Sequence, residues 1–277
     1  MPASILVTGG TGRLGRHLVP LLRDAGHQVR VLSRNARADS GGVEYVTGDL
    51  VTSAGIDAAA DGAEIIVHCA AATKPADDQA QTTNLIKAAS KTRPRHLVYI
   101  SVVGADRVPV VSGVDRAMFG YFSSKLASER AVAESGMPWT TLRATQFHEL
   151  IEIVGRFMAR LPLMPVPAGF RFQPVDSGDV AARLAELTLG DPAGLAPDLG
   201  GPRIYDVPEL LRGYLRAAGK QRPMVPLWLP GKAARAIRAG ANLAPDHADG
   251  HRTWEEYLAG LPASQRPDES FGSTGAG

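Results

Sequence analysis

Short apolar runs alternate with helix-forming stretches through the first 150 residues of this 277-residue chain. The runs are rich in Val and Ile and lack polar alternation, which is typical of parallel strands covered on both faces. They lie at residues 4–8, 28–33, 43–47, 65–70, 96–101 and 139–143, and the helical stretches at 13–25, 79–91 and 122–135. Pro20, inside the first helical stretch, is expected to kink that helix. The alternation predicts an α/β fold, a doubly wound (Rossmann) parallel sheet with right-handed crossovers.

The pattern changes after residue 150, where prolines recur and residues 161–170 (LPLMPVPAGF) cannot form a helix. We therefore expect residues 1–150 to form the Rossmann core and residues 151–262 a smaller, irregular lobe that covers the strand ends. A helix at about 175–190 is expected to return to the core. Residues 263–277 are expected to be a disordered tail.

Composition excludes several classes of protein. The net charge of +2 gives no indication of a nucleic-acid or membrane partner, and no apolar run approaches the length of a membrane span. A single cysteine, Cys69, rules out an intramolecular disulfide framework. His247 and His251 lie four residues apart, but Pro245 and Gly250 favour a turn there, so no metal site is expected. With no basic stretch at its N-terminus, the chain is expected to be cytoplasmic.

A glycine loop, Thr-Gly-Gly-Thr-Gly-Arg-Leu-Gly at residues 8–15, joins the first strand to the first helix. Glycines at this spacing permit a tight turn, a close approach of the backbone to a ligand, and close packing of helix against strand. The N–H groups that open the helix then face an anion. In this strand–loop–helix context the loop predicts dinucleotide binding, with contacts from Gly9, Thr11, Gly12, Arg13, Leu14 and Gly15.

The end of the second strand indicates which dinucleotide is bound. A site for NAD would carry a carboxylate there for the ribose 2′-hydroxyl, whereas this chain has Ser33, Arg34 and, three residues on, Arg37. A guanidinium binds a 2′-phosphate through paired, charge-assisted hydrogen bonds. We therefore predict NADP(H), with Arg13 as a second phosphate contact; the alternative is a solvated loop with ordinary arginines.

Five segments, in order, resemble the short-chain dehydrogenase/reductase superfamily in its extended or atypical, NmrA-like branch. They are the glycine loop, Gly48-Asp49-Leu50, Cys69-Ala70-Ala71-Ala72, Tyr121-Phe122-Ser123-Ser124-Lys125, and Leu142-Arg143-Ala144-Thr145-Gln146-Phe147. The resemblance implies that Asp49 and Leu50 contact adenine and that Lys125 bonds the nicotinamide ribose. It also implies cofactor contacts from Ala70, Ala71, Ala72, Ala144, Thr145 and Phe147.

Tyr121 and Lys125 lie four residues apart and so share one face of a helix. An ammonium there favours the phenolate and lowers the tyrosine pKa, which makes Tyr121 a candidate general acid with Lys125 as its electrostatic partner. The alternative is an ordinary helix face with a half-buried tyrosine and a solvated lysine.

The third catalytic position departs from the superfamily pattern. The fifth strand ends at Ser101, and Val102 and Val103 follow where a catalytic hydroxyl commonly falls. Ser101 fills that role, lines the cofactor, or simply ends the strand.

The leading hypothesis is an NADPH-dependent oxidoreductase that transfers hydride to the carbonyl of a small organic substrate, or the reverse alcohol oxidation. A non-catalytic NADP(H) sensor is the alternative from another class, favoured by the valines after Ser101. A nucleotide-sugar epimerase and a quinone or enone reductase are further variants. The chain is expected to act as a monomer or homodimer.

Overall fold

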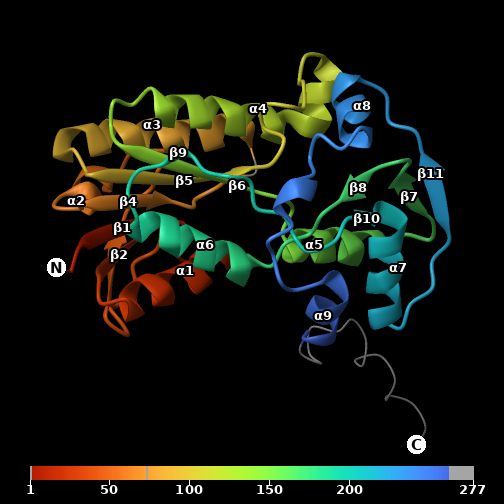
Figure 1. Ribbon diagram of the computed structural model, residues 1–277, viewed down its shortest axis with the longest axis horizontal. Helices are drawn as coiled ribbons and strands as arrows, with labels where there is room; N and C mark the ends of the chain where they lie inside the picture. Colours follow the sequence, from red (N-terminus) through yellow and green to blue (C-terminus); the bar gives the residue numbers. More distant parts are fainter. Residues whose placement is uncertain (1, 73, 262–277) are drawn as a thin grey trace, which may run out of the picture.

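A computed structural model describes residues 2–72 and 74–261 and shows a parallel sheet of seven strands in the order β3-β2-β1-β4-β5-β6-β9 (Figure 1). The strands are β1 (Ser4–Thr8), β2 (Gln28–Ser33), β3 (Val43–Thr47), β4 (Ile65–His68), β5 (His96–Val102), β6 (Trp139–Ala144) and β9 (Gly194–Leu195). The expected fold class is confirmed, and the six predicted strands match to within two residues. The predicted tail lies outside the described residues.

Helices cover both faces of the sheet. On one face lie α1 (Arg13–Asp24) and α6 (Ser177–Leu189); on the other lie α2 (Ile56–Ala60), α3 (Pro75–Thr92) and α4 (Gly113–Ala133) (Figure 1). The helix expected at 122–135 begins nine residues earlier than predicted. Ser112 and Asp115 form a capping box that satisfies the first N–H groups of α4, a signal the prediction overlooked.

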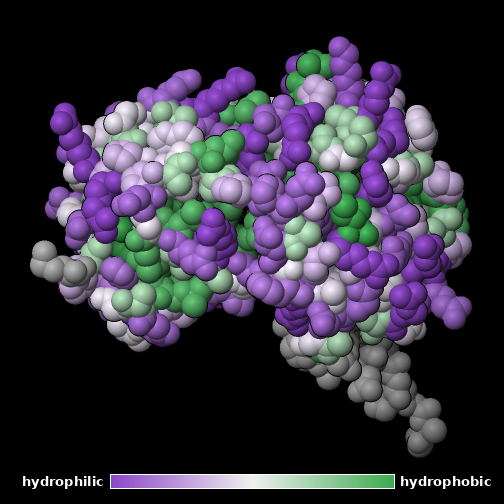
Figure 2. Space-filling model, viewed as in Figure 1, coloured by the Kyte–Doolittle hydropathy of each residue, from purple (hydrophilic) through white to green (hydrophobic). Residues whose placement is uncertain are grey.

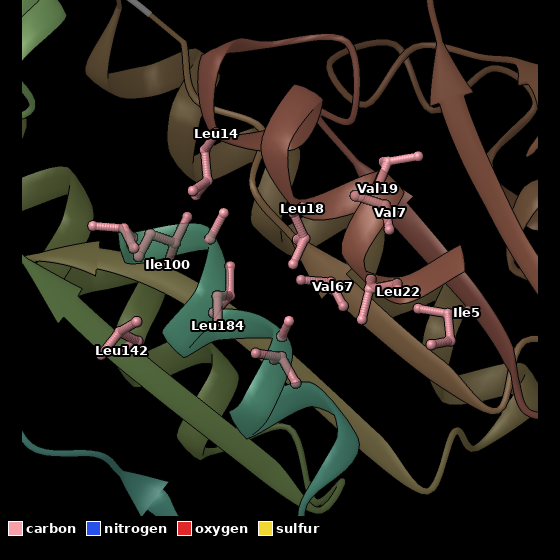
Figure 3. Packing of buried hydrophobic residues seen from close by; sticks show 14 of the residues in the cluster. Ile5, Val7, Leu14, Leu18, Val19, Leu22, Val67, Ile100, Leu142 and Leu184 are labelled. Atoms are coloured by element: carbon pink, nitrogen blue, oxygen red, sulfur yellow. The ribbon is translucent and has the colours of Figure 1, made fainter. Parts of the chain in front are cut away.

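The first helix continues through Pro20, where a kink was expected. Leu18 and Leu22 lie on its inner face and are fully buried against the sheet and α6. Figure 3 shows these two side chains pointing into the cluster that contains Val67 of β4 and Leu184 of α6. Burial of this apolar stripe stabilises a helix that lacks one backbone hydrogen bond.

The remaining elements form a second packed region with its own hydrophobic core, to the right of the sheet in Figure 1. Its helices are α5 (His148–Met158), α7 (Val207–Ala217), α8 (Lys232–Arg238) and α9 (Trp254–Ala259), and its strands are β7 (Met164–Pro167), β8 (Arg171–Phe172), β10 (Tyr205–Asp206) and β11 (Met224–Leu227). β7 pairs with β11 and β8 with β10. These strands were not predicted, because the prolines within β7 and β11 argue against a strand in a sequence. Proline is nevertheless tolerated in edge strands, and both strands of a two-stranded sheet are edges.

The face shown in Figure 2 is mostly hydrophilic, with small hydrophobic patches, one of them over α1 and α6. The outline is indented between α1 of the sheet region and α9 of the lobe. Among the described residues, no helix combines the length and apolar character that a membrane span requires.

Two leucines of α1 allow a matched test of this core. Leu18 is 0% exposed and Leu21 is 41% exposed. We expect Leu18→Ala to lower the free energy of unfolding by about 2–5 kcal/mol through lost burial and a residual cavity. Leu21→Ala should cost less than about 1 kcal/mol. Urea unfolding measures both, and equal losses would contradict the assigned face of α1.

Candidate active site

The strand order reverses between β1 and β4, and the position at the carboxyl ends of these two strands is here called the crevice. The chain leaves β1 for β2 on one side, whereas β4 lies on the other side, so the loops after β1 and β4 diverge at the carboxyl ends of the strands. In doubly wound sheets, ligands bind at this reversal point. The glycine loop and the turn that follows His68 meet there.

Gly9 marks the closest approach between these two loops. Its φ is +71°, and a Cβ at this position would lie 2.6 Å from Ala70 N and 2.7 Å from Cys69 O. A Cβ on Gly15 would lie 2.4 Å from Gly9 O, so α1 can pack this closely against the loop only with glycine at position 15. The N–H of Gly12 donates to Gly9 O at 2.9 Å and closes the turn. The loop is therefore a backbone cradle, as a dinucleotide requires.

The N-terminus of α1 is open to a ligand. Gly12 is its N-cap and supplies no side-chain acceptor for the N–H groups of the first turn. Thr11 and Arg13 are exposed beside them, whereas the Leu14 side chain is buried in the core, so only the backbone of Leu14 could contribute to a ligand site. These residues fit a pyrophosphate.

The loop after β2 offers two free guanidinium groups. Arg34 and Arg37 are exposed, and among the described residues neither makes an ion pair or a side-chain hydrogen bond. Ser33 is buried and donates to Asn35 O at 2.8 Å, which fixes the start of the loop. Asp39 accepts from Tyr45 N at 2.8 Å, so this carboxylate is held by the backbone of β3.

The segment after β3 is fixed by local hydrogen bonds. Asp49 accepts from Val51 N at 2.7 Å, and Leu50 is buried. Asn84 of α3 donates to Leu50 O at 2.8 Å. One oxygen of Asp49 is thus used in its own turn, so any contact of this segment with adenine would use the remaining polar atoms.

The ends of β5 and β6 present one hydroxyl without a partner. Ser101 is 5% exposed, and its Oγ makes no hydrogen bond within the described part of the chain. Thr145 Oγ1 donates to Gln173 O at 2.5 Å and so ties the segment after β6 to the lobe. Ala144 is buried, and Phe147 pairs with Val175 through an isolated bridge. Of these residues, Ser101 alone has a buried hydroxyl free to bind a ligand.

The side chains of Tyr121 and Lys125 differ in their exposure to solvent. Tyr121 is 44% exposed, whereas Lys125 is 2% exposed, which excludes the solvated-lysine interpretation. Lys125 Nζ lies 5.7 Å from the centroid of the Tyr121 ring. Desolvation raises the pKa of Tyr121 and outweighs the opposing effect of the Lys125 charge. Tyr121 is therefore protonated at neutral pH.

Lys125 has partners that the sequence analysis missed. Its Nζ donates to Tyr99 Oη at 3.0 Å and lies 3.4 Å from Asp78 Oδ1. Tyr99 lies two residues before Ser101 on β5, so both side chains point to the α4 face, a periodicity that could have revealed Tyr99. Asp78 precedes the helical stretch predicted at 79–91 and lies in the first turn of α3, where an acidic residue is common and indicates no partner.

His68 packs beside this group as a neutral histidine of the core. Its ring stacks on Tyr99 with centroids 5.4 Å apart, and its two nitrogens contact Thr8 Oγ1 at 2.7 Å and Thr82 Oγ1 at 3.1 Å. Burial, with a smaller effect of Lys125, lowers the pKa of His68 to about 3. The ring therefore carries no charge at neutral pH.

A pocket of about 310 Å³ opens between α1 and α5, beside the crevice. It is lined by Arg13, Arg16, His17, Glu149, Glu152, Ile153, Arg156 and Tyr257. Glu152 is neutralised by Arg156 and accepts from Tyr257 Oη at 2.7 Å. Three arginines, Arg13, Arg16 and Arg156, outnumber the two carboxylates, Glu149 and Glu152, so the lining of the pocket carries a net positive charge.

Gly9 allows a test of the cradle. Gly9→Ala should weaken NADPH binding by about tenfold or more and destabilise the fold, because a methyl group meets the Cys69–Ala70 backbone. Gly26, with φ of +87° and open space around it, is the matched control. Gly26→Ala should show only the backbone penalty of about 1–3 kcal/mol, with NADPH affinity unchanged. Fluorescence titration measures the affinity, and equal effects of the two variants would argue against the cradle.

Comparison with known proteins agrees with this geometry. Ceramide reductase of Caulobacter vibrioides is 30% identical over 241 residues, which cover 82% of this chain and 74% of that protein. An uncharacterized protein of Mycobacterium tuberculosis (strain H37Rv) is 28% identical over 232 residues, and the match spans 82% of this chain but 24% of that protein's length. The chain thus corresponds to about a quarter of the mycobacterial relatives it matches.

A solved structure shares the fold. The NADPH-dependent quinone oxidoreductase QOR2 of Escherichia coli, complexed with NADPH, superposes with a TM-score of 0.75 at 20% identity, over 92% of this chain and 98% of that one. A family model described as NAD(P)H-binding matches residues 9–163, which contain the glycine loop, Tyr121 and Lys125. The chain therefore belongs to the NAD(P)H-binding family, in the NmrA-like branch of the short-chain dehydrogenase/reductase superfamily that its motifs resemble.

Proposed function

We propose that this protein is an NADPH-dependent reductase of a small carbonyl compound, with the cofactor on residues 1–150 and the substrate beneath the lobe. The observation that carries the proposal is the buried Lys125 ammonium, 5.7 Å from the Tyr121 ring centroid. A buried cation beside a partly exposed tyrosine is the arrangement that stabilises charge on a phenol during proton transfer.

The preference for NADP(H) over NAD(H) is proposed from charge. Arg34 and Arg37 are exposed, and no other described residue neutralises them. Asp39, a carboxylate of the same loop, is bound to the β3 backbone. A 2′-phosphate would therefore meet two guanidinium groups that no described carboxylate pairs with.

The chain's own residues supply the proton and the orientation. When bound, a nicotinamide cofactor would supply the hydride for reduction of the carbonyl carbon. Tyr121, protonated at neutral pH, donates its proton to the carbonyl oxygen, and the Lys125 charge stabilises the phenolate that remains. The buried Ser101 Oγ has no partner among the described residues, which supports a hydrogen bond from this hydroxyl to a ligand oxygen.

An apolar substrate is proposed from the surface of α5. Leu150, Val154 and Phe157 are 49%, 42% and 64% exposed and fall on one side of this helix. The stripe begins at Leu150, three residues after Phe147. Phe147 ends the segment that the resemblance places at the nicotinamide. Exposed apolar stripes of this kind mark binding surfaces, and a relative 30% identical to this chain bears the name ceramide reductase.

A second candidate function is a non-catalytic NADP(H) sensor. Val102 and Val103 are buried in the core at the positions where a catalytic hydroxyl commonly falls. A sensor needs the cofactor contacts but not the acid, so loss of the Tyr121 hydroxyl separates the two functions.

Arg34 provides the test of cofactor preference. Arg34→Ala should weaken NADPH binding by about 10- to 100-fold, the equivalent of one lost charge-assisted contact, and leave NADH affinity unchanged. Arg212→Ala, on the exposed side of α7 in the lobe, is the control for charge alone. Fluorescence titration with both nucleotides measures this. Equal NADPH and NADH affinities in the unaltered protein would overturn the NADP(H) preference.

Tyr121 provides the test of chemistry. With a panel of apolar aldehydes and ketones, Tyr121→Phe should lower kcat by a factor of about 100 to 10,000 and leave NADPH affinity unchanged. Because its pKa lies above the ordinary value of about 10, wild-type reduction should be flat from about pH 7 to 9 and should fall only as higher pH removes the proton.

The same change at a remote tyrosine, Tyr45→Phe in β3, should leave kcat unaltered. If Tyr121→Phe reduced carbonyl substrates with an unchanged kcat, Tyr121 would not be the general acid. NADPH binding with no oxidation across the whole panel would favour the sensor.

A further inference from the structure

The ammonium of Lys125 lies at the centre of a group of side chains from three elements. Tyr99 Oη of β5 accepts from Nζ at 3.0 Å, and Asp78 Oδ1 of α3 lies 3.4 Å from it. An ammonium has three N–H donors, so these two partners leave one direction for a ligand. The orientation of that third donor depends on where the other two are held.

Asp78 does more than accept from Lys125. It is 2% exposed, its Oδ1 accepts from Ala72 N at 3.3 Å, and its Oδ2 accepts from Ser124 Oγ of α4 at 3.3 Å. Ala72 belongs to the turn after β4 that borders the crevice. The Asp78 carboxylate thus contacts Lys125, the helix α4 that carries Lys125, and the turn after β4 at the predicted cofactor site.

Asp78 is also the carboxylate that balances the Lys125 charge. Glu129 lies one turn further along α4, but Arg143 holds both of its oxygens, at 2.9 and 2.7 Å. His68 is neutral, and Tyr99 and Tyr121 are protonated, because burial raises the pKa of both phenols. An ammonium buried without a counter-charge is strongly unfavourable, so Lys125 depends on Asp78.

We propose that Asp78 is a positioning residue that acts through Lys125, holding its ammonium where it binds the nicotinamide ribose. This inference rests on the proposed function, in which Lys125 bonds that ribose. Asp78 itself touches neither substrate nor cofactor.

A double-mutant cycle tests the proposal through NADPH affinity, measured by fluorescence titration, with urea unfolding as a second readout. Lys125→Met should weaken NADPH binding by about tenfold or more, through loss of one charge-assisted contact. Asp78→Asn should weaken it by a similar factor, because Lys125 then loses the carboxylate that orients its ammonium. If Asp78 acts through Lys125, the double variant should bind NADPH as Lys125→Met does, to within about twofold. Its urea midpoint should exceed that of Lys125→Met, because no buried charge is left unpaired.

Three outcomes would overturn the inference or the function beneath it. Unchanged NADPH affinity in Asp78→Asn, or a double variant weakened by the product of the two single effects, would show that Asp78 does not act through the lysine. Unchanged affinity in Lys125→Met would instead remove the proposed function of the lysine. The neutral double variant keeps the test usable if Asp78→Asn alone fails to fold.

Asp115→Asn is the matched control. Asp115 is a buried aspartate of the α4 capping box, three turns from Lys125. Its loss should lower the urea midpoint without a change in NADPH affinity. If Asp115→Asn weakened NADPH binding as much as Asp78→Asn does, the effect of Asp78→Asn would be explained by general destabilisation of α4.

Discussion

The position of the ligand crevice follows from the absence of a side chain at Gly9. The loop after β1 passes so near the end of β4 that a single methyl group would meet the Cys69–Ala70 backbone at 2.6 Å. This approach brings the open N-terminus of α1 and the turn after β4 to the same place, at the reversal of strand order. The crevice therefore arises from backbone packing, and side chains from other strands add chemistry to it.

The two faces of the sheet differ in what they bury. The face under α1 and α6 is apolar, with Leu18, Leu22 and Leu184 in one cluster (Figure 3). The face under α3 and α4 also holds ionic pairs, Lys125 with Asp78 and Arg143 with Glu129. Buried ion pairs contribute little net stability compared with apolar packing. Their position at the crevice end of the sheet is instead consistent with holding charge where a ligand binds.

The regular part of the fold was predictable because its signals are local. Unbroken Val- and Ile-rich runs gave the six strands of the core, and the glycine spacing gave the turn into α1. β9 was missed because two residues beside β6 carry no periodicity of their own. The lobe was expected to be irregular, whereas its short strands form two two-stranded sheets. These strands were not predicted because they contain prolines or lie close to them, and edge strands tolerate proline.

The candidate site was predictable only as far as motifs extend. The spacing of Tyr121 and Lys125 indicated a shared helix face, but not that one side chain is exposed and the other buried. Asp78 and Tyr99 reach Lys125 from elements 47 and 26 residues away in the sequence, so no local pattern joins them. Long-range pairing of this kind is fixed by the packing of α3 and β5 against α4.

We infer that this crevice binds NADP(H) with the nicotinamide at Lys125 and Tyr121. A crystal structure of the protein with NADP⁺ would show whether it does. We expect the pyrophosphate on the N–H groups that open α1, the 2′-phosphate on Arg34, and the nicotinamide ribose within hydrogen-bond distance of Lys125 Nζ. A cofactor bound elsewhere, or a ribose with no contact to Lys125, would contradict this inference.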